Sequence, residues 1–298
     1  MNLGGTIALS YDEAGPVTLS GTELLGESDL AVVELEPVQS NELSWTHLLA
    51  LRAELLSMSQ GGEHQAVVIT GTDTVEDVGN FLHLAAPPDI RIALLVSLQT
   101  ASRGKPVRGI DAALTWLRSD GDSRLRLFVD GIPYSVPFEK RWAGDRWDFP
   151  ASPDTMMPPW RVPASSRLDP VMPTVPVLSV GIGCGTWARQ LIELVPSAGL
   201  VLEAYGSGDV PPDIVQSLEA YLASGAHIVI TSLSHHSRVK SSYPNIPGTS
   251  HGLLSAGCYS GVSLTAREAR MRLAIALACD SNDAPRRAFE TSSSALQL

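Results

Sequence analysis

Short apolar runs alternate with amphipathic segments through most of this sequence, and this alternation limits the fold more than any other feature. The apolar run 66–70 is followed by a segment in which Val75, Val78 and Phe81 recur at helical spacing. A second apolar run, 92–96, comes next. Repetition of strand, turn and helix in this order predicts an α/β domain with a mostly parallel sheet.

The same pattern returns in the C-terminal half. Predicted strands cover residues 177–181, 199–203 and 227–230, and apolar residues at helical spacing between Ile214 and Leu222 predict a helix between the last two strands.

A final helix is predicted to begin at Thr265, because Glu268 three residues later completes a capping box. The segment 281–298 is rich in Ser and Ala and shows no periodicity, so we expect a disordered tail there.

Between the two halves, residues 149–176 contain eight prolines. Proline lacks a backbone donor and has a fixed φ, so this stretch can be neither a helix nor a central strand. We interpret it as an interdomain linker, with a long surface loop inside one domain as the alternative. The sequence therefore predicts two α/β domains with mostly parallel sheets: a larger N-terminal domain over 1–160, a linker over 161–176 and a smaller C-terminal domain over 177–280.

Charge and cysteine content exclude several classes of protein. The formal net charge of −11 argues against a general nucleic-acid binder, which needs a basic surface. No apolar run approaches about 20 residues and the N-terminus lacks a signal-peptide pattern, so we expect a cytoplasmic protein that does not enter a membrane. Three widely spaced cysteines, Cys184, Cys258 and Cys279, fit buried thiols better than a disulfide framework.

Two short segments carry groups suited to catalysis. Gly-Gly-Thr-Ile-Ala at 4–8 contains Thr6, and Gly-Thr-Asp-Thr-Val-Glu at 71–76 contains Thr72 and Asp73 directly after a predicted buried strand. Ligands of open parallel sheets bind beyond the carboxyl ends of the strands, where Thr72 and Asp73 are expected. Each segment alone also has a structural explanation, as a glycine turn or as a helix N-cap.

Taken together, the two segments resemble the signature segments of the L-asparaginases. The resemblance implies an amidohydrolase in which Thr6 attacks a carboxamide while Thr72, Asp73 and Lys140 form a hydrogen-bonded catalytic chain. Lys140 follows the predicted strand end at Asp130 by ten residues, as the family arrangement requires. Tyr11 matches the tyrosine of the family's mobile loop, and Asp73 also pairs with the substrate's ammonium group.

The C-terminal half is similar to the family as well. Residues 203–211 resemble its glycine-rich loop, and residues 243–270 resemble its closing loop and the helix that follows. The resemblance therefore covers nearly the whole chain in the right order. It also implies close subunit pairing, as a homodimer or homotetramer, in which the closing loop with Asn245 reaches the partner's pocket. We expect a small amide substrate, no cofactor and no metal.

Some positions depart from the family pattern. The serine that binds the substrate carboxylate aligns with Gln39, or with Ser40 after a one-residue slip, and Asp209 stands where the family favours Asn. The substrate-binding set implied by the resemblance comprises Gln39, Ser40, Gly71, Asp73, Asp209 and Asn245. These departures indicate a different small amide or a reduced activity.

The start of the chain is also unusual, because only Met1, Asn2 and Leu3 precede the first glycine segment. We expect a largely missing first strand and a poorly anchored Thr6, either because the true start lies upstream or because the member is degenerate. A non-catalytic protein of this fold that binds an amino-acid-like ligand is therefore the alternative function. A third possibility is an amidase subunit that feeds ammonia to a tRNA-dependent amidotransferase; such relatives carry an additional N-terminal domain.

Overall fold

The computed structural model describes residues 1–12, 15–25, 31–101, 105–151, 160–194, 197–234, 237–241, 243–244 and 246–290. The chain forms two compact units. The first comprises Met1–Ser152 with Pro163–Ser165, and the second comprises Pro153–Val162 with Ser166–Leu298.

The first unit is built on a six-stranded sheet with the strand order β4-β1-β5-β6-β7-β8. All neighbours are parallel except β7 and β8, which form an antiparallel pair. The predicted parallel α/β pattern is therefore confirmed here. The strands are β1 (Asn2–Gly4), β4 (Glu34–Val38), β5 (Gln65–Ile69), β6 (Arg91–Val96), β7 (Leu125–Val129) and β8 (Ile132–Ser135).

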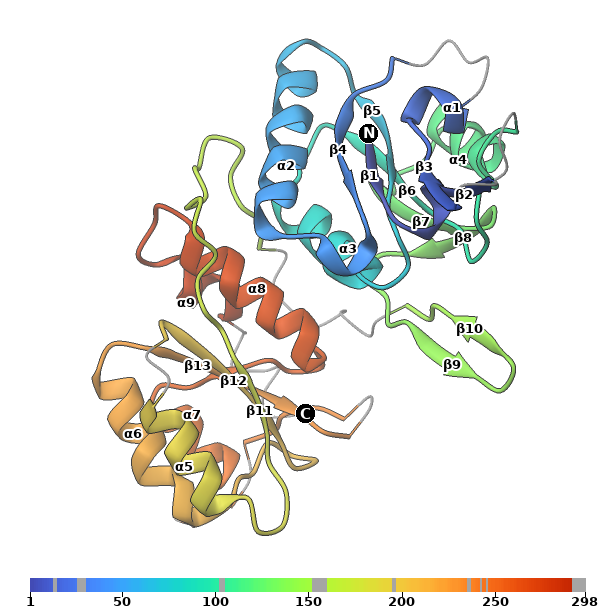
Figure 1. Ribbon diagram of the computed structural model, residues 1–298. Coiled ribbons are helices and arrows are strands. Elements are labelled where there is room, and N and C mark those ends of the chain that lie inside the picture. The colour runs from blue at the N-terminus through green and yellow to red at the C-terminus, as the bar shows by residue number, and fades with distance from the viewer. Residues whose placement is uncertain are drawn as a thin grey trace. The chain divides into compact units, whose positions relative to one another are not determined.

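Helices cover both faces of this sheet (Figure 1). On one face lie α2 (Trp45–Gln60) and α3 (Val75–Ala85), where the Trp45 and Phe81 rings meet edge to face at 5.7 Å. On the other face, α4 (Ile110–Arg118) and the short α1 (Gly21–Leu25) share one apolar cluster with residues of β5, β6 and β7. Apolar burial on both faces explains why β5 and β6 read as apolar runs in the sequence.

The first strand is short but well held. Asn2 pairs with Glu34 of β4 and with Ile69 of β5, so β1 lies inside the sheet. After it, Gly5 N donates to Val38 O at 3.0 Å and a 3-10 turn, η1 (Thr6–Ala8), begins. The first strand is as short as expected, with three residues, and a hydrogen bond to β4 holds the backbone directly before Thr6.

Two hairpins leave the sheet. The strands β2 (Leu9–Asp12) and β3 (Gly15–Thr18) form one of them, directly after η1. The strands β9 (Arg141–Ala143) and β10 (Arg146–Asp148) form the other, which extends away from the six-stranded sheet (Figure 1). The base of this second hairpin is fixed by the buried rings of Phe138 and Phe149, whose centroids lie 5.9 Å apart.

The second unit contains a parallel sheet in the order β11-β12-β13-β14. Its strands are β11 (Val177–Ser179), β12 (Gly199–Ala204), β13 (His227–Ser232) and β14 (Tyr259–Ser260). Helices α5 (Gly185–Leu194) and α6 (Val215–Ala223) cover one face, and α8 (Ala266–Ala278) covers the other (Figure 1). Two further turns, η2 (Ser40–Glu42) and η3 (Pro212–Ile214), and the short α7 (Ser250–Ser255) complete the described elements.

The predicted capping box is confirmed, since the Thr265 side chain accepts from Glu268 N while Glu268 accepts from Thr265 N at 2.8 Å. The prediction of a structureless tail was wrong for its first part. A six-residue helix, α9 (Ala284–Phe289), packs on α8, and Arg272 Nε donates to Ala288 O at 2.7 Å. A helix this short carries too few apolar positions to give a periodic signal. Residues 291–298 lie outside the described part of the chain.

Part of the predicted linker also has defined contacts. Asp169 N donates to Ala278 O at 2.8 Å, and Leu168 bridges Cys279 in antiparallel fashion, so residues 166–176 belong to the second unit.

Candidate active site

The two glycine segments meet through their backbones at the carboxyl ends of β1 and β5. A Cβ added to Gly5 would lie 2.3 Å from Gly71 Cα, and Gly5 has a φ of +90°. A Cβ added to Gly71 would lie 2.5 Å from the Ser40 hydroxyl. Only residues without side chains allow so close an approach, so the glycines bring the first segment against the second.

Thr6 opens η1 immediately after this contact, and Tyr11 lies in β2, paired with Pro16 of β3. The placement of the Thr6 and Tyr11 side chains lies outside what the structure describes. What is described is their backbone, which follows the carboxyl end of β1, the edge of a parallel sheet where ligands bind.

Ser40 holds the second segment in shape. Its buried hydroxyl accepts a hydrogen bond from Asp73 N at 3.2 Å and lies 3.2 Å from the Thr74 hydroxyl. Gln39, the other candidate for the substrate carboxylate, is exposed, and its N–H donates to Glu42 at 3.2 Å. Of the two alternatives, Ser40 contacts the segment 71–76, whereas Gln39 lies at the surface. Asp73 itself is exposed beside them.

Lys140 reaches the second segment from the base of the β9–β10 hairpin. Its half-buried side chain donates from Nζ to Thr72 O at 2.9 Å, and its N–H donates to the Glu76 carboxylate at 2.9 Å. The lysine therefore contacts Thr72 through the main-chain carbonyl. The Glu76 carboxylate anchors the backbone of the lysine.

Asp130 has a comparable role at the end of β7. Ser97 Oγ donates to its carboxylate at 2.6 Å, which ties the ends of β6 and β7 together. The residue adopts a φ of 48°, a conformation that asparagine and aspartate tolerate better than most side chains. This turn directs the chain into β8 and onward to Lys140.

In the second unit, the Asp209 carboxylate accepts hydrogen bonds from two nearby serines. Ser250 N at the start of α7 donates to one carboxylate oxygen at 2.8 Å, and the Ser207 hydroxyl donates to the other at 3.0 Å. These bonds hold the glycine-rich loop against α7. Asn245 lies outside the described residues.

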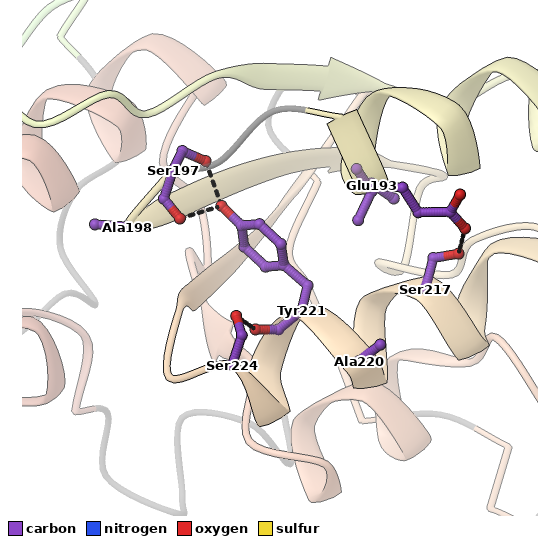
Figure 2. Close-up of a pocket in the computed structure, with 8 residues that line it drawn as sticks. Glu193, Ser197, Ala198, Ser217, Ala220, Tyr221 and Ser224 are labelled. Carbon is purple, nitrogen blue, oxygen red and sulfur yellow. Dashed lines mark hydrogen bonds between the residues drawn. The ribbon is translucent and has the colours of Figure 1, made fainter.

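A cavity of about 570 Å³ lies between α5, α6 and the start of β12 (Figure 2). Tyr221 donates to Ser197 O at 2.9 Å, and Ser217 donates to the Glu193 carboxylate at 3.2 Å, as Figure 2 shows. Burial raises the pKa of the Tyr221 phenol, with its hydrogen bond to Ser197 acting in the opposite direction. These groups bond to one another and join α6 to α5. None of the predicted site residues lines this cavity.

Two features are absent from the residues that the structure describes. In those ranges, no helix is long and apolar enough to cross a membrane. Within the same part of the chain, His, Cys, Asp and Glu side chains do not gather in groups of three or more that could hold a metal ion.

Comparison with known proteins identifies the family of this chain. A family profile described as "Asparaginase, N-terminal" matches residues 1–105, and one described as "Glutaminase/Asparaginase C-terminal domain" matches residues 177–289. The chain belongs to the L-asparaginase family. It is 25% identical to an L-asparaginase of Bacillus licheniformis over 92% of this chain and 93% of that protein.

Solved structures from the same family share the fold. L-asparaginase I from Vibrio cholerae superimposes with a TM-score of 0.72 at 17% identity, over 99% of this chain and 97% of that chain. A probable cytoplasmic L-asparaginase from Campylobacter jejuni gives a TM-score of 0.68 at 18% identity, over 96% of each chain. These matches confirm the predicted class of two α/β domains with a smaller C-terminal domain.

Proposed function

We propose that this member of the L-asparaginase family hydrolyses a small carboxamide to the acid and ammonia, with Thr6 as nucleophile. One observation carries the proposal: Lys140 Nζ donates to Thr72 O at 2.9 Å although 68 residues separate the two in sequence. Because the Lys140 side chain reaches the segment that holds Thr72 and Asp73, these three residues can act as one catalytic chain.

The proposed reaction has two steps. The Thr6 hydroxyl adds to the amide carbon while its proton passes along the chain of Thr72, Asp73 and Lys140 to the Lys140 amine, which becomes an ammonium. That chain then delivers a proton to the leaving nitrogen, the C–N bond breaks and ammonia departs. Water hydrolyses the resulting ester, which releases the acid and restores the Thr6 hydroxyl. Donors around the carbonyl oxygen stabilise the negative charge that develops in each step.

The substrate is proposed to be a small amino-acid amide. The exposed carboxylate of Asp73 is suited to pair with an ammonium group. Ser40 uses its hydroxyl to support Asp73 and Thr74, so Gln39 is the side chain left to meet the substrate's carboxylate. Gln39 stands where the family has the serine that binds the substrate carboxylate. This departure favours a small amide other than plain asparagine.

Two further points accompany the proposal. The relatives are named as enzymes, so the alternative of a non-catalytic ligand-binding protein is not favoured. We also propose a cytoplasmic location, because a similar chain from Campylobacter jejuni carries that description.

The test is an ammonia-release screen over asparagine, glutamine, their D-forms and simple amide analogues. With the best substrate, Thr72→Val and Lys140→Met are each expected to remove nearly all activity, while circular dichroism remains that of the wild type. Lys105→Met, which changes an exposed lysine of the same unit, is the matched control and should retain activity. Activity of either site variant within a few-fold of the wild type would contradict the proposed chain.

A further inference from the structure

An indole ring covers the Lys140 ammonium. Lys140 Nζ lies 4.4 Å from the centroid of the Trp147 ring, within the range of a cation–π contact. Trp147 is 39% exposed, so part of the residue remains in contact with solvent. The same ammonium donates to Thr72 O, so two groups hold the end of this side chain.

The hairpin explains why these groups share a face. Trp147 pairs directly with Trp142 across β9 and β10, and their rings meet edge to face at 5.1 Å. Alternate residues of a strand point to the same side, so Lys140 lies on the face of Trp142. The neighbouring pair Arg141 and Asp148 points to the other face and forms an ion pair at 3.4 Å.

Hydrogen bonds hold the backbone at the base of the hairpin, whereas the Lys140 side chain can rotate about its own bonds. Glu139 N donates to Pro150 O at 3.1 Å, and Lys140 N donates to Glu76 at 2.9 Å, so the backbone beside the lysine is held. A lysine side chain has four rotatable bonds, and ordering it has an entropic cost. The Trp147 ring and the Thr72 carbonyl are the described contacts that offset this cost.

We propose that Trp147 is a positioning residue, which holds the Lys140 ammonium against Thr72 and excludes water from one side of it. This proposal rests on the proposed function, in which Lys140 belongs to the catalytic chain. Trp147 acts through the lysine and does not touch the reacting atoms. A partly exposed cation–π contact of ordinary strength corresponds to about a two- to five-fold change in the population of the placed lysine.

The first experiment measures steady-state kinetics of Trp147→Leu with the best amide from the screen. We expect kcat to fall about two- to five-fold with KM nearly unchanged, because the contact concerns the lysine and not the substrate. Trp147→Phe keeps an aromatic face and should recover part of the loss. Trp142→Leu is the matched control, since it removes the other indole of the same pair, and it should stay close to the wild type.

The second experiment does not depend on activity. The native protein is treated with limiting acetic anhydride, and acetylation of each lysine is quantified by mass spectrometry. In Trp147→Leu, labelling of Lys140 should rise about two- to five-fold, the factor expected from loss of the cation–π contact. The exposed Lys105 and Lys240 serve as internal references and should not change.

The two experiments separate the possible failures. If no amide releases ammonia but Lys140 labelling rises in Trp147→Leu, the proposed function fails and the indole contact stands. If the wild type is active and Trp147→Leu changes neither kcat nor Lys140 labelling, the positioning role is refuted. If Trp147→Leu does not fold, acetylation of Lys140 is measured in Trp147→Phe instead. Acetylation as fast as in urea-unfolded protein would overturn the proposal, and slower acetylation of Lys140 would support it.

Discussion

Replacement of Gly5 by alanine tests whether the two glycine segments, 4–8 and 71–76, depend on direct backbone contact. The added Cβ would lie 2.3 Å from Gly71 Cα and 2.6 Å from Gly71 N, far inside an ordinary contact distance. Both neighbours are main-chain atoms, so no side chain can rotate away. The segment 71–76 must therefore move, or β1 must leave its place between β4 and β5.

Two effects contribute to the loss of folding stability in Gly5→Ala. Alanine at a φ of +90° costs roughly 1–2 kcal/mol, because the left-handed region is unfavourable for residues with a Cβ. Overpacking against a backbone that cannot yield adds about 1–3 kcal/mol. Gly62→Ala isolates the first effect, since Gly62 has a φ of +83° and nothing within 4 Å of the added Cβ. The difference between the two variants is therefore expected to be about 1–3 kcal/mol.

The assay is differential scanning calorimetry of the wild type, Gly5→Ala and Gly62→Ala. For a unit of this size, 1 kcal/mol shifts Tm by roughly 2–4 °C, so Gly5→Ala should melt about 2–12 °C below Gly62→Ala. At temperatures where both are folded, Gly5→Ala should also have lost most activity, because Thr72 follows Gly71 directly. Equal melting temperatures for the two variants would refute the inferred contact between the segments.

Three other predictions concern specificity, assembly and pH. Gln39→Ser should improve the use of plain L-asparagine, which the unmodified chain should use poorly; efficient turnover by the wild type at micromolar asparagine would contradict this. We propose a homodimer or homotetramer in which the stretch 241–245 of one subunit reaches the pocket of another, so light scattering that finds an active monomer would be evidence against it. Burial lowers the pKa of His227, which stacks on Tyr259 with ring centroids 5.8 Å apart. Because the folded state favours the neutral His227 ring, its contribution to stability is present above the unfolded pKa of about 6.5 and is lost as the pH falls through the lower folded pKa. The Tm of the wild type should therefore drop between pH 7.5 and 5. The Tm of His227→Asn should drop less over the same range.

Local patterns in the sequence were sufficient for the architecture. The apolar runs at 66–70 and 92–96 became β5 and β6, and the capping box at Thr265 begins α8 as predicted. Such features depend on neighbours a few residues apart, whose side-chain spacing is set by the period of a helix or strand. Where the local signal was short the prediction failed, as it did for the six residues of α9.

At the candidate site, the sequence indicated which residues to consider, but it did not indicate which of their atoms are in contact. Resemblance of the motifs to a family singled out Thr72, Asp73 and Lys140, but spacing alone did not indicate that the lysine meets the Thr72 carbonyl while Trp147 covers its ammonium. The sequence left the choice between Gln39 and Ser40 open, and it did not indicate that the Ser40 hydroxyl accepts a hydrogen bond from Asp73 N.

These contacts join residues that are far apart in the chain. Their geometry follows from how β1 enters the sheet, how closely glycine backbones approach, and where the hairpin after β8 turns back. Each of these depends on the packing of whole elements, because side chains from different strands and loops must fill one shared volume. Periodicity within a single segment carries no information about that volume, so the sequence determined the elements and their order, and tertiary packing determined which groups meet at the site.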